Sequence, residues 1–150
     1  MSILIPLNNY PVMEQETVLL KEIDFPSSTE NIALVEKLVD NVCEENGVNE
    51  DYYGNILIAL TEAVNNAIVH GNSKDVNKQV RVCCESRQKE ILFTVEDQGP
   101  GFDYDNLPDP TDPVNIEKPN GRGVFLMKNL ADNISFHDNG RKVELNFSLK

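Results

Sequence analysis

The chain has 150 residues, the length of one domain that can bury a core large enough to fold without disulfides or a structural metal. Its 40% hydrophobic and 25% charged residues fit an ordinary soluble globular domain. The net charge of −12 at pH 7 argues against nucleic acid and anionic membranes as partners, because both are bound by basic surfaces.

Cysteine usage indicates a reducing compartment, and hydropathy gives no sign of a membrane span. Cys43, Cys83 and Cys84 are odd in number and have no Cys-x-x-Cys spacing, which argues against a disulfide framework and against a zinc site. The amino-terminal segment lacks the features of a signal peptide, and no apolar run approaches the length of a transmembrane helix. We therefore expect buried, reduced thiols in a cytoplasmic protein.

The first part of the chain predicts an arm, a strand and a helix. Residues 1–16 contain two prolines and no hydrophobic period, so we expect an N-terminal arm ahead of a single domain over 17–150. A strand over 17–25 precedes Ser27–Glu30, which matches a capping box and predicts a helix that ends at a left-handed Gly47. The expected inner stripe of this helix is Ile32, Val35, Leu38, Val39 and Val42.

The remaining elements predict an α/β (α+β) fold. Runs rich in β-branched residues indicate strands, and a proline-rich stretch indicates an irregular loop. The expected elements are a helix over 49–70 stopped by Gly71, a hairpin over 79–86 and 91–97, a loop over 102–120, a helix over 122–131, and a hairpin over 134–137 and 142–149 with an Asn139-Gly140 turn. This order indicates a two-layer sandwich, with a mixed, mostly antiparallel sheet that carries helices on one face.

The helix expected over 49–70 carries an acid and an amide among apolar residues. Glu62 and Asn66 are four positions apart and therefore project side by side, about 40° apart around the helix axis. Buried polar groups need partners, and a metal-bound ligand is one such partner. A satisfied polar pair on an exposed strip is the alternative. The apolar stripe on roughly the opposite side is Leu57, Leu60, Val64 and Ile68.

A second motif follows the strand expected over 91–97. Asp97 ends this strand, and Gly99 and Gly101 follow at two-residue spacing. Glycine permits positive φ and close approach of the backbone to a ligand. An ionised aspartate only accepts hydrogen bonds, so it can recognise an exocyclic amine. Taken alone, these residues are also typical of an ordinary strand-ending turn.

A third motif opens the last expected helix. Gly121 and Gly123 lie at its entry, where free N–H groups and the helix dipole favour phosphate. The Walker spacing and the dinucleotide fingerprint are both absent, so this Gly-x-Gly is weak evidence by itself. Arg122 is a candidate for contact with phosphate or with an acidic partner, and a solvated side chain is the alternative.

Taken together and in this order, the three motifs resemble the N, first-glycine and second-glycine boxes of the GHKL (Bergerat-fold) ATPase superfamily. Asn66-Ala-Ile-Val-His-Gly71 and Gly121-Arg-Gly-Val-Phe-Leu-Met127 are most similar to the bacterial anti-sigma-factor serine/threonine-protein kinases, which are short, stand-alone ATPase domains. The resemblance covers about residues 17–149. It implies a histidine-kinase-like ATPase fold.

The resemblance also implies a site for ATP and Mg²⁺. Glu62 matches the family's catalytic base, Asn66 the Mg²⁺ ligand at the nucleotide phosphates, and Asp97 the residue that recognises adenine. The glycines of both boxes would shape the pocket and its lid. The implied ATP-binding residues are Asn66, Asp97, Gly99, Gly101, Gly121, Arg122, Gly123 and Val124.

The implied activity is that of an ATP-dependent protein serine/threonine kinase and anti-sigma-type regulator in a partner-switching circuit. It would phosphorylate a small partner resembling an anti-sigma-factor antagonist, and the same surface could sequester a sigma factor. No direct contact with nucleic acid or membrane is expected, and a homodimer is compatible with this function. The alternative is a nucleotide-sensing protein-binding module without significant kinase activity, since the same motifs serve both.

Overall fold

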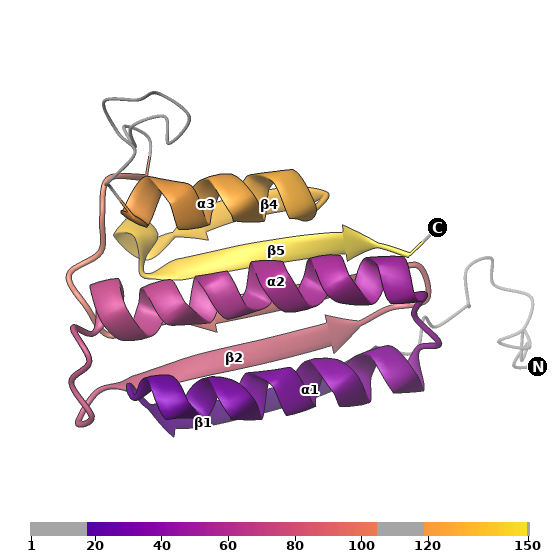
Figure 1. Cartoon of the computed structure of the whole chain (residues 1–150), viewed down its shortest axis with the longest axis horizontal. Helices are drawn as coiled ribbons and strands as arrows, with labels where there is room; N and C mark the ends of the chain where they lie inside the picture. Colours follow the sequence, from indigo (N-terminus) through magenta and orange to yellow (C-terminus); the bar gives the residue numbers. More distant parts are fainter. Residues whose placement is uncertain (1–17, 105–118, 150) are drawn as a thin grey trace, which may run out of the picture.

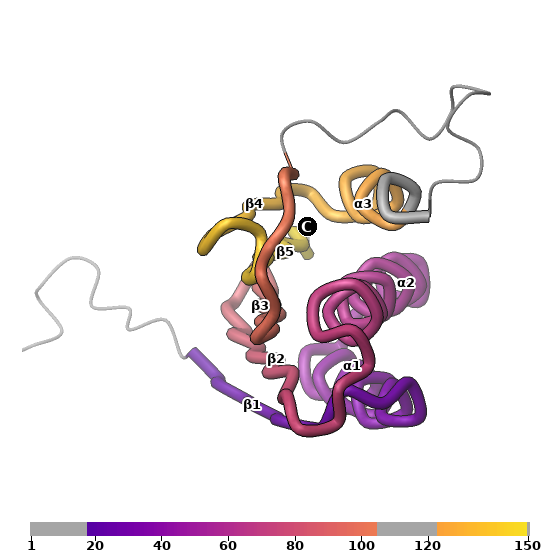
Figure 2. The backbone as a smooth tube through the Cα atoms, turned by 90° about the vertical axis from the view of Figure 1, so that its left-hand side faces the viewer, coloured from indigo at the N-terminus to yellow at the C-terminus, as the bar shows by residue number. Residues whose placement is uncertain are grey.

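The computed structural model of this chain describes residues 18–104 and 119–149. It has two layers, a five-stranded sheet and a set of helices packed on one face of that sheet (Figure 1 and Figure 2). The two-layer fold predicted from the order of elements is therefore confirmed. The arm expected over 1–16 and most of the loop expected over 102–120 lie outside the described residues.

The sheet is antiparallel throughout, in the order β1-β2-β3-β5-β4, and the expectation of a mixed sheet is wrong. Two hairpins pair β2 with β3 and β4 with β5. The pairs of β1 with β2 and of β3 with β5 are also antiparallel, so no parallel pair forms among the described strands. The strands are β1 (Leu19–Pro26), β2 (Gln79–Ser86), β3 (Glu90–Glu96), β4 (Asn133–His137) and β5 (Lys142–Ser148).

The helical layer places the longest helix in the middle. α1 (Ile32–Glu45) follows a single 3-10 turn, α2 (Glu50–Asn66) continues into a π-helical turn, η3 (Ala67–Gly71), and α3 (Pro119–Leu130) precedes β4. α2 lies between α1 and α3 (Figure 1). Within the described residues, no helix combines the length and the apolar character needed to cross a bilayer.

The core lies between the helices and the inner face of the sheet. Fully burying one aliphatic side chain contributes about 1.5–3 kcal/mol, so the two helix stripes hold the layers together. Ile32 and Leu57, also predicted for these stripes, are only partly buried. The predicted stripe residues that are buried are Val35, Leu38, Val39 and Val42 in α1, and Leu60, Val64 and Ile68 in α2 and η3.

One helix-end signal in the sequence is confirmed, and the structure shows a second residue that defines a helix end. Gly47 has a φ of +60° just after α1, a backbone conformation that glycine adopts without steric cost. Asn49 is the N-cap of α2, and its side-chain oxygen accepts a hydrogen bond from the Asp51 N–H at 2.8 Å. This bond satisfies one of the N–H groups that the first helical turn leaves free.

The capping box expected at Ser27–Glu30 is wrong. Ser28, which precedes the 3-10 turn, makes no side-chain capping bond. The Ser27 hydroxyl instead donates to the Lys78 carbonyl at 2.6 Å, because Ser27 is fully buried where the end of β1 meets the start of β2. The hydroxyl is thus bonded to a residue 51 positions later in the chain and is not free to cap the helix.

The cysteine thiols are free, as expected. Cys43 and Cys84 are buried in the core, and Cys83 is half-buried on β2. Burial raises the pKa of the Cys43 and Cys84 thiols to about 11, because a buried thiolate loses its hydration. These two thiols are therefore neutral at physiological pH.

Loss of the α2 cap should measurably destabilise the fold. Asn49→Ala removes the acceptor for the Asp51 N–H and should lower the free energy of unfolding by about 1 kcal/mol, measured by urea denaturation. Asn55→Ala, inside the same helix, is the matched control. It should be neutral or stabilising, because alanine is the best helix former. Equal losses in the two variants would contradict the capping role.

Candidate functional site

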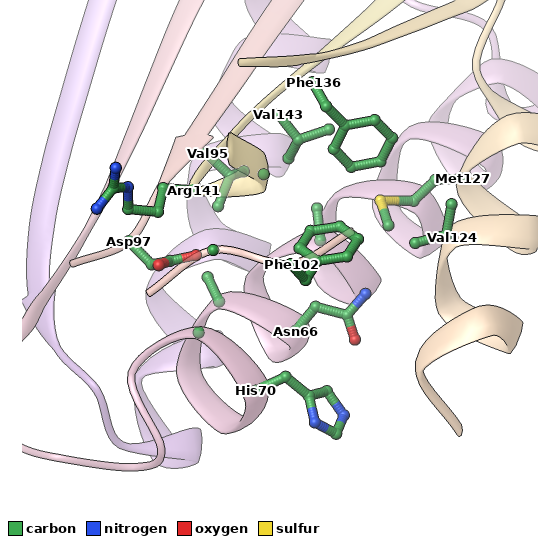
Figure 3. Close-up of a pocket in the computed structure, with 15 residues that line it drawn as sticks. Asn66, His70, Val95, Asp97, Phe102, Val124, Met127, Phe136, Arg141 and Val143 are labelled. Atoms are coloured by element: carbon green, nitrogen blue, oxygen red, sulfur yellow. The ribbon is translucent and has the colours of Figure 1, made fainter. Parts of the chain in front are cut away.

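A cavity of about 260 Å³ lies between α2, α3 and the sheet (Figure 3). A concave, largely apolar pocket with a few convergent polar groups is typical of small-molecule sites. Its polar side chains are Asn66, His70, Asp97 and Arg141. The larger apolar residues of its wall are Val95, Phe102, Val124, Met127, Phe136 and Val143.

On the helical side of the site, Glu62 and Asn66 lie against the start of α3. A Cβ placed on Gly123 would lie 2.9 Å from Asn66 Nδ2 and 3.3 Å from Glu62 Oε2. The backbone of Gly123 therefore lies directly beside both polar groups. Glu62 is next to the cavity wall without being part of it, whereas Asn66 lines the cavity.

The first turn of α3 brings backbone N–H groups to the same region. Gly121 and Arg122 lie in this turn, and Val124 is buried at the cavity wall. Free N–H groups and the helix dipole make such a terminus favourable for phosphate. The Arg122 side chain, expected to contact phosphate or an acidic partner, lies outside what the structure describes.

Asn66 has the properties of a ligand group for a hard cation. It is half-buried and lines the cavity, and no hydrogen bond within the described residues engages its side chain. Among all the residues that the structure describes, no group of three or more His, Cys, Asp or Glu side chains is placed to hold a metal ion. Mg²⁺ commonly takes one or two protein oxygens and fills its remaining positions with phosphate and water. The residues present therefore fit an ion that Asn66 and a bound nucleotide hold together.

Asp97 lies across the cavity from Val124 and Met127, just beyond the end of β3 (Figure 3). Its Oδ1 accepts a hydrogen bond from the Gly99 N–H at 2.8 Å. Burial raises the pKa of Asp97, although that hydrogen bond and the Arg141 charge act in the opposite direction. A ligand that donates a hydrogen bond to this half-buried carboxylate would offset the lost hydration.

Gly71 provides the surface on which Asp97 rests. A Cβ on Gly71 would lie 2.4 Å from the Asp97 Cγ, and a Cβ on Gly99 would lie 1.8 Å from the Gly71 carbonyl oxygen. Gly101 has a φ of +85°, and its Cβ would lie 2.2 Å from the Asn139 carbonyl oxygen. The glycines after Asp97 are therefore required by three backbone segments that meet here, and not by the approach of a ligand alone.

The π-helical turn at the end of α2 shapes this junction. The Asn72 N–H donates to the Ala67 carbonyl at 2.8 Å, a bond that spans one residue more than an α-helical bond. Turns of this kind are frequent at functional sites. His70, the penultimate residue of this turn, is exposed on the cavity wall (Figure 3).

Several wall residues lie outside the three sequence motifs. Phe102 meets Phe136 edge to face with ring centroids 5.5 Å apart, and Tyr104 stacks on Phe136 at 4.8 Å. Phe136 and Arg141 come from the β4–β5 hairpin, which contains none of the three motifs. Phe102 directly follows Gly101, and this adjacency is the one signal that could have identified it.

Gly71 should not tolerate a side chain. Gly71→Ala should lower the free energy of unfolding, because its Cβ would overlap the Asp97 carboxylate, so that the carboxylate must leave its hydrogen bond to the Gly99 N–H or the backbone must shift. The expected loss is about 1–3 kcal/mol by urea denaturation. Gly54→Ala is the matched control: a Cβ there meets nothing within 4 Å, and the change should stabilise α2 by roughly 0.5–1 kcal/mol. A stable Gly71→Ala protein would contradict the described contact.

Comparison with known proteins identifies the family. The family model for the histidine kinase-like ATPase domain matches residues 25–147. Curated relatives include the serine-protein kinase RsbW of Bacillus cereus (strain AH187) and that of Bacillus anthracis. Each is 29% identical over 129 residues, which cover 81% of this chain and 80% of the relative.

A solved structure shows the same fold. The RsbU and RsbW domains of Rv1364c from Mycobacterium tuberculosis align with a TM-score of 0.62 at 15% identity, over 88% of this chain and 32% of that one. This chain therefore spans about a third of that structure. Because the family model covers most of the chain, including every site residue named above, this protein belongs to the histidine kinase-like ATPase domain family.

Proposed function

We propose that this protein binds ATP with Mg²⁺ in the cavity and transfers the γ-phosphoryl group to a serine or threonine hydroxyl of a small regulatory protein. One observation carries this proposal: Glu62, Asn66 and the backbone of Gly123 converge at one side of a cavity that reaches Asp97. A single nucleotide could thus present its phosphates to the first group and its base to Asp97. The relatives named serine-protein kinase support this reading.

Base recognition falls to Asp97 and the apolar wall. The carboxylate accepts a hydrogen bond from the exocyclic amine of adenine, which guanine and hypoxanthine lack at that position. Val95 and Val143, neighbours on β3 and β5, offer apolar surface to the ring on the sheet side. The cavity therefore favours a planar heterocycle with an amine at the edge that faces Asp97.

Phosphate binding falls to Asn66 and the start of α3. Asn66 would hold Mg²⁺ through its amide oxygen, and the ion would neutralise charge on the phosphate oxygens. Backbone N–H groups in the first turn of α3, which contains Gly121 and Arg122, would donate to the same oxygens. Phosphoryl transfer depends mainly on positioning and electrostatics, so these groups supply most of what the reaction requires.

Glu62 is placed to act on the nucleophile. The acceptor hydroxyl oxygen forms a bond to the γ-phosphorus, the bond from that phosphorus to the ADP oxygen breaks, and the hydroxyl proton passes to the Glu62 carboxylate. Glu62 lies beside Asn66 but outside the cavity wall. A hydroxyl carried by a second protein can therefore reach it without entering the pocket.

The resemblance of the three motifs to anti-sigma-factor kinases guides the choice of partner. We infer a protein resembling an anti-sigma-factor antagonist as the phosphoacceptor and a sigma factor as the protein that is released or held. The net charge of −12 favours protein partners with basic surfaces over nucleic acid. A nucleotide-sensing module without kinase activity is the competing function. ATP binding by the wild-type protein without transfer to any such partner would establish that module.

Glu62→Gln should separate chemistry from binding. The amide cannot accept the hydroxyl proton, so transfer from γ-radiolabelled ATP to the partner should fall by about 10²–10⁴-fold while the Kd for Mg-ATP stays unchanged. Asn66→Ala is the matched comparison on the same helix face, and it should weaken Mg-ATP binding itself. Full-rate transfer by Glu62→Gln would refute the assignment of Glu62 as the base.

Asp97→Asn should relax the preference for ATP over ITP, which carries a carbonyl in place of the amine. Loss of a charged acceptor should weaken ATP binding by about 10–100-fold and leave ITP little affected, measured by calorimetry. Equal weakening of ATP and ITP would count against Asp97 as the base-recognition group.

The same substitution should not destabilise the nucleotide-free protein at pH 7. Burial raises the pKa of Asp97, so the folded state favours the neutral carboxyl group. The stability gained from that neutral form is lost as the pH rises from the unfolded-state pKa through the folded-state pKa. At pH 7 the free Asp97→Asn protein should therefore be at least as stable as the wild type.

A further inference from the structure

We infer that Asn72 is a positioning residue that orients Asp97 for recognition of the base, an inference that rests on the proposed function. Asn72 belongs to none of the three motifs and does not line the cavity. It follows Gly71 and is fully buried, with 0% of its surface exposed. An amide so buried is costly unless all of its polar atoms are paired.

Every polar group of Asn72 has a partner. Its Nδ2 donates to the Ser27 hydroxyl at 2.8 Å and to the Gln79 carbonyl at 3.0 Å, and its Oδ1 accepts from the Gln98 N–H at 2.7 Å. Its own N–H and carbonyl are hydrogen-bonded as well. The carbonyl of Gln79 can only accept and the N–H of Gln98 can only donate, so the orientation of the amide is determined.

The bond to Gln98 acts directly on Asp97. Asp97 lies between two peptide planes, and each plane is held by one hydrogen bond. The Asp97 N–H donates to the Arg141 carbonyl at 2.9 Å, and the next N–H, that of Gln98, donates to Asn72. Because a peptide unit is planar, these two bonds restrain the φ and ψ of Asp97 and hence the direction of its Cα–Cβ bond. The hydrogen bond from the Gly99 N–H then holds the carboxylate oxygen Oδ1.

The anchor of Asn72 is the sheet itself. Its amide nitrogen bonds to Ser27 after β1 and to Gln79 at the start of β2. The Gln98 side chain in turn accepts a hydrogen bond from the Gln79 N–H at 2.7 Å. The adjacent Gly71 supports the Asp97 carboxylate. Two consecutive residues therefore act on Asp97. Gly71 packs against its carboxylate, and Asn72 accepts the hydrogen bond from the N–H of the next residue, Gln98.

The test compares three amide substitutions through the ratio of Kd for ITP to Kd for ATP. Asn72→Ala removes every side-chain bond. Asn72→Asp keeps an oxygen that faces the Gln98 N–H but loses both donations to the sheet. Asn46→Ala is the matched control. Asn46 also ends a helix and donates hydrogen bonds to a backbone carbonyl and to a serine hydroxyl, and it is not one of the site residues named above.

Calorimetry with Mg²⁺ should be run where circular dichroism shows each variant folded. Asn72→Ala should reduce the ITP-to-ATP ratio by roughly tenfold, whereas Asn72→Asp and Asn46→Ala should lower the Tm and leave the ratio unchanged. If Asn72→Ala does not fold, Asn72→Ser takes its place with the same expectation.

Two results of the variant comparison would overturn the inference. One is an unchanged ratio in Asn72→Ala, or in Asn72→Ser where it replaces it. The other is an equal fall of the ratio in Asn46→Ala, which would assign the effect to general destabilisation. Absence of ATP binding by the wild-type protein would refute the proposed function, and this inference with it. If the wild-type protein prefers ATP and Asn72→Ala has the same ratio of Kd for ITP to Kd for ATP, the inference is refuted and the proposed function is not.

Discussion

The site depends on one close contact, the packing of the Gly71 backbone against the Asp97 carboxylate and against the backbone of Gly99. The contact joins the end of α2 and η3 to the end of β3, and it leaves no room for a side chain at either glycine. It partly removes Asp97 from water and so raises the pKa of the carboxyl group. A group held in this way is directed at the cavity and gains from a ligand that donates to it.

The other side of the cavity depends on the crossing of α2 and α3. Gly123 allows the start of α3 to approach Glu62 and Asn66, so an acid, an amide and a row of backbone N–H groups share one small volume. The π-helical turn η3 connects this side to the Asp97 side along a single continuous helix. The distance between the two sides is thereby set by the rigid backbone of α2, and rigidly held groups of this kind can act on a bound molecule without reorganising.

Local patterns predicted most of the elements because their causes are local. Gly47 and Asn49 act within a few residues of the helix ends that they define. Ser27 shows the limit of such reasoning, since its hydroxyl donates to the carbonyl of Lys78, just before β2, and cannot cap the helix that follows. The mixed sheet was wrongly predicted for a related reason: the direction of β5 beside β3 is decided by pairing across the sheet, which no short stretch of sequence encodes.

The sequence by itself determined the fold class, the stripes that face the core and the order of the motifs that contain Glu62, Asn66, Asp97 and Gly123. These depend on periodicity, on glycine and on spacing along one chain segment. The tertiary structure alone decided which distant residues complete the site. Asn72 bonds to residues 26 and 45 positions away, and Phe136 and Arg141 reach the cavity from a hairpin without any motif. Such contacts follow from the packing of layers, because a buried amide or ring takes whichever partner the fold brings within reach.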